Sequence, residues 1–300
     1  MSQTATIVGG HTVTLALDPT EVQAAQDALA QLGQGYSDGA VLTSRFTPPV
    51  EGDLNVYNIG GGSVNPVLMP YGSQAIVLTG SSNASIYGGA SPEVLIGNAG
   101  NDFISGGGGS GSIIAGDGDN VIKTGSVSGP FYILTGTGHD TINLGSGSDT
   151  VVTEGSATVI GGSGSLFFQA GSFGSESVVG GSGDATMIGG FGNNVFVAGT
   201  GNTTMQAGGG SHDTFVGGSH SDTMAAAGAS SVLFEFDSTQ GGGHHTITGF
   251  DSVHDTVSLG GYLNGSAVVT HPGGNTLITM GDGTTITLTG YTGNVNIQYH

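Results

Sequence analysis

Cysteine is absent from this chain, and lysine and arginine are almost absent. Without cysteine, the protein forms neither a disulfide framework nor a thiolate metal site. Its two cationic residues, Arg45 and Lys123, stand against 22 carboxylates, so the formal net charge is -20. Such a surface repels nucleic acid and anionic lipid, which leaves divalent cations and neutral or cationic surfaces as the favoured partners.

Long apolar segments are missing as well. No run approaches the roughly 18 apolar residues that a membrane-spanning helix needs, so we expect no membrane insertion. Residues 1–17 lack the basic start and the unbroken apolar run of a secretory signal. We therefore expect any export to proceed without a cleaved N-terminal signal peptide.

Glycine, at 61 of 300 residues, is abundant and periodic. Aperiodic glycine at this level would indicate disorder, whereas a period indicates repeat structure. Residues 97–123 read as three stacked units of nine, with small residues at places one to five and an apolar residue at place eight. The same frame from residue 52 to residue 123 puts these residues at place eight: Ile59, Leu68, Val77, Ile86, Leu95, Ile104, Ile113 and Ile122.

The frame becomes irregular after residue 123 but continues to residue 234. Its apolar positions there are Ile142, Val151, Val159, Phe168, Val178, Met187, Phe196, Met205, Phe215, Met224 and Leu233. The change from isoleucine and leucine to phenylalanine and methionine predicts a core of different shape in the later half.

Period and residue type together predict an all-β fold. Glycine-rich places one to five favour a turn, and places seven to nine favour a short strand with place eight pointing inward. Two units of nine then make one coil, which gives two facing parallel sheets. We expect a parallel β-roll, or β-solenoid, of nine-residue half-coils over residues 52–234, and such arrays require caps at their ends.

Both ends of the chain differ from the repeats. Residues 1–51 are expected to hold a hairpin around Gly9-Gly10 and one helix at about 19–32, which we expect to cover the open end of the array. Asp18 as N-cap, Pro19 and Glu21 form a helix start of the capping-box type. Residues 235–300 contain longer strands separated by turn signals, which predict an antiparallel β cap and a possible secretion signal.

The repeats resemble those of the RTX (repeats-in-toxin) calcium-binding β-roll proteins, whose pattern is Gly-Gly-x-Gly-x-Asp-x-apolar-x. Four units carry the likeness best: 97–105, 135–143, 144–152 and 217–225. Segments 241–262 and 275–290 look like the tails that follow such arrays. The resemblance extends over roughly residues 52–290 and leaves the first fifty residues unexplained.

The resemblance implies that calcium is bound by the sixth-place aspartates and by turn carbonyls of neighbouring coils. Transferred to this chain, it makes Asp102, Asp140, Asp149, Asp213 and Asp222 candidate ligands, with Asn120 beside Asp102 one coil away. Most other sixth places hold residues without a carboxylate, so we expect calcium in part of the turns. Oxygen ligands of this kind suit calcium.

No credible catalytic site is found. Gly35-Tyr-Ser-Asp-Gly39 has the spacing of a nucleophile elbow, but it follows a predicted helix instead of a strand. The histidines, including His244-His245, are expected to be solvated. We therefore expect a secreted or cell-surface, non-enzymatic protein that serves as a structural matrix or adhesive and contacts polysaccharide or other copies of itself.

Two other functions stay open. The chain could be a secreted effector or polysaccharide-acting enzyme that uses the solenoid for export and folding, with its active part in residues 1–51 or on a solenoid face. Alternatively, the array could be a plain export module. The export route implied by the RTX resemblance is a one-step route that reads an uncleaved C-terminal signal.

Overall fold

The computed structural model of the chain describes residues 3–6, 12–15, 17–31, 54–59, 67–68, 74–209, 212–226 and 231–300. It falls into two compact units, residues 1–158 and 159–300. In the described residues regular structure is mostly β-strand, and both units are built as a parallel β-solenoid. The domain boundaries predicted at residues 51 and 234 remain predictions.

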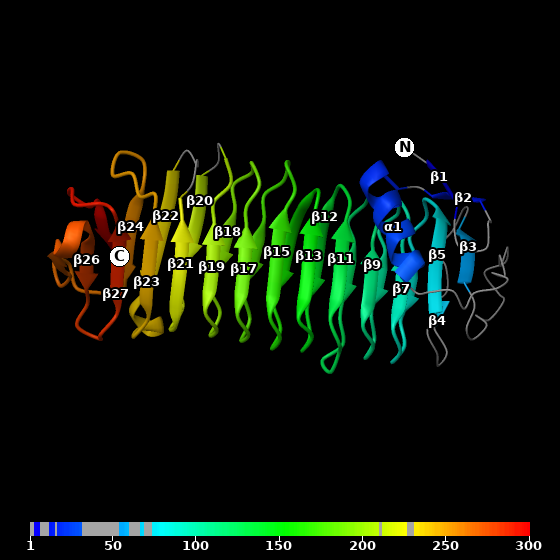
Figure 1. Cartoon of the computed structure of the whole chain (residues 1–300), viewed down its shortest axis with the longest axis horizontal. Coiled ribbons are helices and arrows are strands. Elements are labelled where there is room, and N and C mark those ends of the chain that lie inside the picture. Colours follow the sequence, from blue (N-terminus) through cyan, green and yellow to red (C-terminus); the bar gives the residue numbers. More distant parts are fainter. Residues whose placement is uncertain are drawn as a thin grey trace. The chain divides into compact units, whose positions relative to one another are not determined.

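In the first unit, successive strands of the array belong alternately to two parallel sheets, and strands of one sheet lie side by side (Figure 1). One sheet has the order β13-β11-β9-β7-β5-β3, and the other has the order β12-β10-β8-β6-β4. The elements are β1 (Gln3–Thr6), β2 (Thr12–Leu15), α1 (Pro19–Gln31), β3 (Leu54–Ile59), β4 (Val67–Leu68), β5 (Gln74–Gly80), β6 (Ser85–Tyr87), β7 (Glu93–Ile96), β8 (Phe103–Ser105), β9 (Gly111–Ile114), β10 (Val121–Lys123), β11 (Phe131–Thr135), β12 (His139–Asn143) and β13 (Asp149–Thr153), and β14 (Ser156–Ile160) crosses the boundary between the units.

In each sheet of the first unit, the inward side chains of successive coils stack in a column, and these inner columns confirm the stacking prediction. Ile104 is in register with Ile86 on one side and with Ile122 on the other. All three are fully buried, as each place-eight residue should be. The facing column is Leu95, Ile113, Ile133 and Val151. Each such side chain contributes roughly 1.5–3 kcal/mol by leaving water.

The frame predicted from residue 52 is wrong at its start. Val77 is in register with Ile96, whereas Ile76 is in register with the inward residue Leu95. One extra residue in a turn moves a strand by one place, which exchanges its inner and outer faces. Ile59 and Leu68 are displaced too, and their register partners are Gly80 and Tyr87.

The predicted helix and hairpin are present. β1 pairs with β2 in antiparallel fashion, and α1 begins at Pro19 with the expected capping box. The Glu21 amide donates to Asp18 Oδ1 at 2.8 Å, and the Asp18 amide donates to Glu21 Oε2 at 3.1 Å. The expected glycine turns of the hairpin, the connector after the helix and its stop at Gly33 lie outside the described residues.

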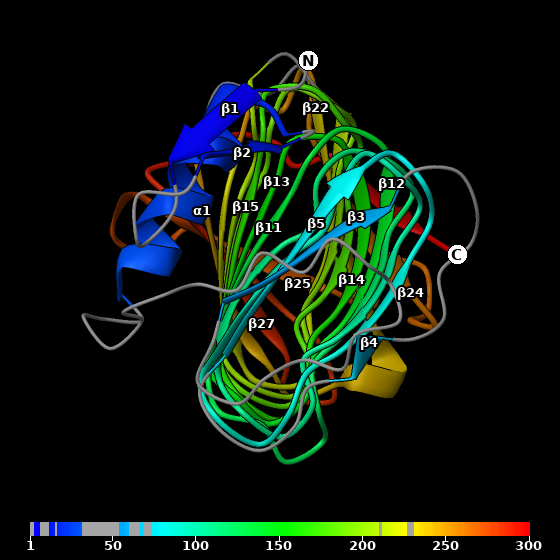
Figure 2. The ribbon, with the colours of Figure 1, turned by 90° about the vertical axis from the view of Figure 1, so that its right-hand side faces the viewer.

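We had expected helix α1 to cover the open end of the array, and this is wrong. It lies against the outer face of the sheet that contains β5, β7, β9 and β11 (Figure 2). Leu17, Val22, Ala25 and Ala28 pack there against these buried residues: Ala75, Val77, Val94, Ile96, Ile114 and Leu134. The helix docks at this face because the strands present apolar side chains outward as well as inward.

The second unit continues the same two-sheet construction within itself. Its sheets have the orders β15-β17-β19-β21-β23-β27-β26-β25 and β16-β18-β20-β22-β24-β28. The strands are β15 (Leu166–Ala170), β16 (Ser177–Val179), β17 (Ala185–Ile188), β18 (Val195–Val197), β19 (Thr203–Gln206), β20 (His212–Val216), β21 (Ser221–Ala225), β22 (Ser231–Asp237), β23 (His244–Thr248), β24 (Thr256–Gly260), β25 (Val268–Thr270), β26 (Thr276–Thr279), β27 (Thr285–Thr289) and β28 (Ile297–Tyr299), with short 3-10 helices η2 (Ser238–Gln240) and η3 (Pro272–Gly274).

Phenylalanine and methionine fill the core of the second unit, as predicted. Phe196 and Phe215 stack with ring centroids 5.7 Å apart and planes only 3° from parallel. Phe215 and Phe234 meet edge to face at 5.9 Å. The frame had placed Leu233 inward, and this is wrong, because Leu233 is in register with Thr214 and the fully buried Phe234 takes the core position.

The C-terminal part combines two kinds of pairing. β25, β26 and β27 form the expected antiparallel arrangement. β27 also pairs with β23 in parallel, and β28 pairs in parallel with β24. The last coil therefore carries both a continuation of the array and an antiparallel cover. Across the described residues, no helix has the length and apolar character needed to cross a bilayer.

Candidate metal centre

The sixth residue of a nine-residue unit lies where a turn ends and a strand begins, and the described acidic and amide side chains at this place are buried in the coil. In the first unit three of the predicted ligands, Asp102, Asn120 and Asp140, occupy this place in consecutive coils. Each accepts through Oδ1 the amide of the sixth-place residue one coil earlier, at 2.8 Å from Ala84, 2.9 Å from Asp102 and 2.9 Å from Asn120. The side chains therefore form a continuous ladder between coils.

The remaining side-chain atoms of these residues differ in a way that matters for cations. Asp102 Oδ2 accepts the Asn98 amide of its own turn at 3.1 Å. Asn120 Nδ2 instead donates to the turn carbonyls of Gly116, at 3.1 Å, and Gly118, at 3.2 Å. The asparagine amide thus occupies carbonyls that would otherwise face a cation.

Asp140 Oδ2 is buried and makes no well-formed hydrogen bond among the described residues. The Thr135 hydroxyl lies close enough to lower the pKa of Asp140 in part, but burial dominates and raises it to about 6. Burial likewise raises the pKa of Asp102 to about 6, against the opposing effect of its two amide donors. A cation beside these carboxylates would favour their ionised form.

Asp149 lies in the other column of sixth places. Its Oδ1 accepts the Phe131 amide at 2.8 Å, and its Oδ2 is buried without a well-formed partner in the part of the chain that the structure describes. Burial raises its pKa. Its neighbour one coil earlier is Phe131, so no second carboxylate faces Asp149 from that side.

The two candidates of the second unit lie in different columns. Asp213 Oδ1 accepts both the backbone amide of Asn194, at 2.8 Å, and its Nδ2, at 3.0 Å. Asp222 accepts amides from Thr203 and Gly218, at 3.1 and 2.9 Å. The structure therefore does not bring Asp213 and Asp222 together.

His245 is not solvated, in contrast to our expectation. It is in register with Asp222 one coil later, and its Nδ1 lies 3.1 Å from Asp222 Oδ2, with both side chains buried. The Phe236 ring packs against the imidazole at 4.7 Å between centroids. A histidine thus stands where the pattern would place the next ligand, while His244 is exposed as expected.

Three acidic sixth-place residues were missed in the sequence. Glu93, Glu176 and Asp255 each end a turn two residues before an inward apolar residue. Asp255 accepts the amides of Val232 and Asp251, each at 2.8 Å, as the other ladder members do. The signal that identifies them is their position two places before the apolar residue, with glutamate allowed beside aspartate.

The donor set fits calcium in part. Calcium prefers hard oxygen ligands from carboxylates and backbone carbonyls. The buried Oδ2 atoms of Asp140 and Asp149 are such oxygens and lack well-formed partners among the described residues. No three His, Asp or Glu side chains of these residues are grouped as a metal cluster, so a site here would combine a carboxylate with turn carbonyls.

Comparison with known protein families agrees with this construction. A family model described as the RTX calcium-binding nonapeptide repeat matches four segments, residues 87–122, 132–160, 171–205 and 207–231. The segments include all six predicted ligands. No significant relative is found among curated proteins.

Proposed function

We propose that this protein, whose residues 87–231 carry four copies of the RTX calcium-binding nonapeptide repeat, is a secreted, non-enzymatic solenoid that binds calcium in part of its turns. The repeat solenoid is a structural fold, and RTX repeat proteins are typically secreted by type I systems. In this proposal the array serves as a surface-associated matrix or adhesive component.

The buried Oδ2 of Asp140 is the observation that carries the calcium proposal. A carboxylate oxygen without a partner costs desolvation free energy that a bound cation would offset. Asp140 and Asp149 are the residues that would hold the ion, with carbonyls of their turns, and calcium would supply positive charge in a chain of net charge -20. At a free calcium concentration about 100 times the dissociation constant of a site, that site would add about 2.7 kcal/mol to the free energy of unfolding.

Titration calorimetry and circular dichroism, with calcium and with a chelator, test the calcium proposal. We expect calcium to raise the melting temperature and Asp140→Asn to reduce the number of ions bound. Asp184→Asn is the matched control, because Asp184 is exposed and outside the sixth place. Identical strand content, melting and ion uptake in calcium and chelator would contradict calcium binding.

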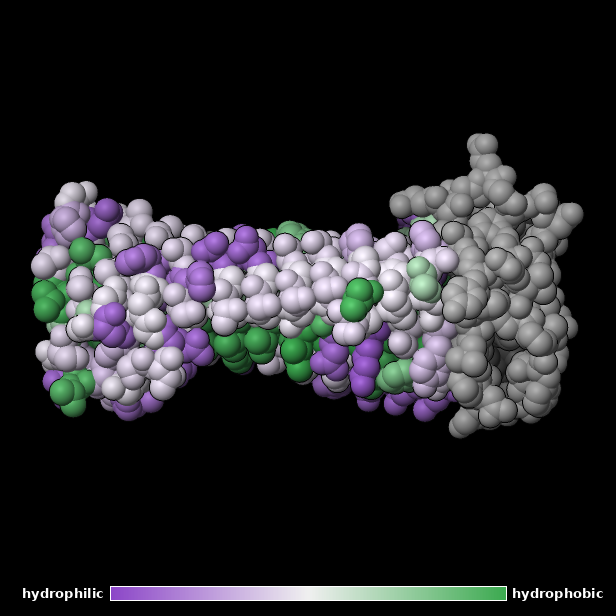
Figure 3. All heavy atoms as spheres, turned by 90° about the horizontal axis from the view of Figure 1, so that it is seen from below, coloured by the Kyte–Doolittle hydropathy of each residue, from purple (hydrophilic) through white to green (hydrophobic). Residues whose placement is uncertain are grey.

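Exposed aromatic residues support the adhesive part of the proposal. Phe173 and Phe191 occupy equivalent places in consecutive turns and are 82% and 64% exposed. Apolar side chains also gather along part of the face in Figure 3. Such residues favour contact with a surface or a second copy. Electron microscopy of the calcium-loaded protein would show fibres or sheets, and a dispersed monomer at every concentration would argue against self-association.

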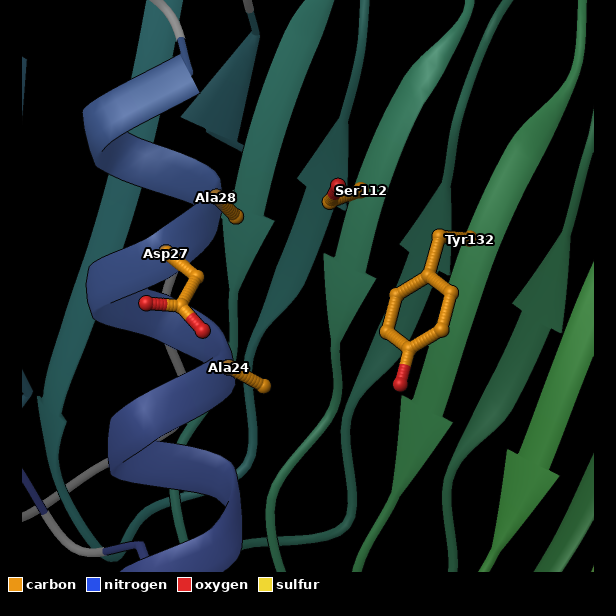
Figure 4. A pocket seen from close by; sticks show the side chains of 5 residues that line it. All are labelled: Ala24, Asp27, Ala28, Ser112 and Tyr132. Atoms are coloured by element: carbon orange, nitrogen blue, oxygen red, sulfur yellow. The ribbon is translucent and has the colours of Figure 1, made fainter.

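A pocket beside α1 favours a second candidate function, glycan binding. It has a volume of about 330 Å³ and is lined by Ala24, Asp27, Ala28, Ser112 and Tyr132 (Figure 4). The half-exposed Tyr132 ring offers a stacking surface and Asp27 an acceptor for sugar hydroxyls. Asp27 is the one carboxylate among these lining residues, whereas glycoside hydrolysis commonly needs a pair.

A glycan-array screen and a glycan-hydrolysis assay separate glycan binding from glycan hydrolysis. Binding that Tyr132→Ala abolishes, without turnover, would support recognition. Turnover that Asp27→Asn abolishes would support the polysaccharide-acting enzyme instead.

A further inference from the structure

Four carboxylates meet where the start of α1 docks on the turn edge of the first unit. Asp18 and Glu21 come from the helix start, and Asp117 and Glu154 come from turns of the array; charge repulsion from the other three acts on Glu21. Among the described residues Lys123 is the sole lysine or arginine, and its ammonium lies over the Phe103 ring, 5.7 Å from the centroid. No lysine or arginine of the described part therefore neutralises the cluster, and the positive charge that acts on Asp18 is that of the N-terminal amino group.

Glu21 does more than complete the capping box. The box uses Oε2, which accepts the Asp18 amide. The other oxygen, Oε1, is buried and has no hydrogen-bond partner among the described residues, and the whole residue is 0% exposed. A helix cap alone needs one carboxylate oxygen, so the second oxygen is left without a structural role.

The unpartnered oxygen lies in the neighbourhood of Asp117. A Cβ placed on Gly136 would lie 2.8 Å from Glu21 Oε1 and 2.9 Å from Asp117 Oδ1, so both oxygens lie beside the Gly136 backbone. Calcium ligands lie at about 2.3–2.6 Å from the ion, so both side chains would have to turn away from that backbone to share one. Asp117 Oδ1 is already oriented by the amide and hydroxyl of Thr137, at 2.9 and 2.6 Å.

The second pair of carboxylates also interacts. Against the opposing effect of burial, Glu154 and backbone amides lower the pKa of Asp18. Burial raises the pKa of Glu154 to about 7 and that of Glu21 to about 8, so a cation beside them would offset the cost of holding their charges there.

We propose that Asp18, Glu21, Asp117 and Glu154 form a divalent-cation site, best suited to calcium, that fastens α1 to the array. The site is separate from the sixth-place ladder, because none of its members is a sixth-place residue. No three carboxylates of the described residues already surround a metal position, so ion binding draws the two sides together. The bound ion joins the helix start to two turns of the array.

Hydrogen exchange of the full chain, with calcium or chelator at pH 7.5, tests the site. We expect calcium to slow exchange in residues 19–31 at least tenfold, and Glu21→Gln to abolish this slowing while keeping the side-chain shape. Asp27→Asn is the matched control, since Asp27 is exposed on the same helix and should leave the effect intact. Glu154→Gln, at the edge of the cluster, should weaken it even if Glu21→Gln disturbs folding.

Three outcomes would overturn the proposal. Calcium could leave helix exchange unchanged in the wild type, or the slowing could persist in both Glu21→Gln and Glu154→Gln. Protection that follows pH alone, rising toward pH 5 without calcium and ignoring the ion, would mean a shared-proton cluster. Asp140→Asn separates this experiment from the ladder, because it should remove calcium binding at Asp140 and leave the calcium effect on the helix.

Discussion

At the scale of single residues, the sixth-place side chain connects each coil to the preceding one. Its carboxylate or amide oxygen accepts a buried backbone amide that would otherwise lack a partner at the turn, as Asp102 does for Ala84. A hydrogen bond of this type contributes about 0.5–1.5 kcal/mol, and more when the acceptor is charged. Asparagine adds donors that hold turn carbonyls, so Asn120 and Asn194 reinforce their turns without an ion.

Glu93 gives a prediction for pH dependence. Its Oε2 accepts the Gly89 amide at 2.7 Å, Oε1 is buried, and burial raises the pKa from 4.5 to about 8. The folded chain therefore binds this proton more tightly than the unfolded chain, and the free energy of unfolding falls as the pH rises from about 4.5 to about 8. In calcium-free buffer, Glu93→Gln should reduce the loss of melting temperature between pH 5 and pH 8.

Glu235→Gln is the control for this measurement, because Glu235 is only half-buried and pairs with His300 at 3.5 Å. Equal pH slopes for Glu93→Gln and the wild type would show that Glu93 carries no proton in the folded chain at neutral pH.

The sequence predicted which residues fill the core wherever the coil length stays constant, as for Ile86, Ile104 and Ile122. It failed where one residue is added, as at Val77 and Leu233, because strand residues alternate between faces and a shift of one place reverses them. The burial of His245 could not be predicted from a pattern of apolar residues, since its partner is a carboxylate of the neighbouring coil.

At the scale of elements, α1 shows how the start and the docking place of a helix differ in predictability. Its start is encoded locally by Asp18, Pro19 and Glu21, and the structure has it at Pro19. Its docking place depends on outward apolar residues in several coils. Val94, Ile96 and Ile114 occupy seventh and ninth places, and this run of outward aliphatic residues is the sequence signal for a covered face.

Ala25 tests the docking of the helix. It is fully buried between α1 and the sheet, so Ala25→Glu would force a charge into an apolar contact without a partner. We expect this change to release the helix, with exchange in residues 19–31 at least tenfold faster and the sheet signal in circular dichroism kept.

Gln23→Glu is the matched control, because it adds the same charge at an exposed position of the same helix. Gln23→Glu should lower the free energy of unfolding by only about 0.5 kcal/mol, because the new carboxylate repels Asp27 one turn away. Equal exchange in the Ala25→Glu and Gln23→Glu variants would contradict the docked position of α1.

At the scale of the whole molecule, the repeat architecture was predictable because it depends on a period, and a period is carried by many residues at once. The division into two units with different cores is visible in the sequence only as the change from isoleucine to phenylalanine and methionine. In such arrays each coil is stabilised mainly by its neighbours, so the loss of one contact is expected to spread over a short distance.

Paired core substitutions test this locality. Ile104→Ala and Phe215→Ala each remove a fully buried side chain, at a cost of about 2–5 and about 3–5 kcal/mol. Because stability in stacked coils is set by nearest neighbours, Ile104→Ala should speed exchange in β6, β8 and β10, and leave β18, β20 and β22 unchanged. Phe215→Ala should do the reverse. Exchange that accelerates equally in all six strands would mean that the two units unfold as one cooperative body, and that the nearest-neighbour description does not apply to this protein.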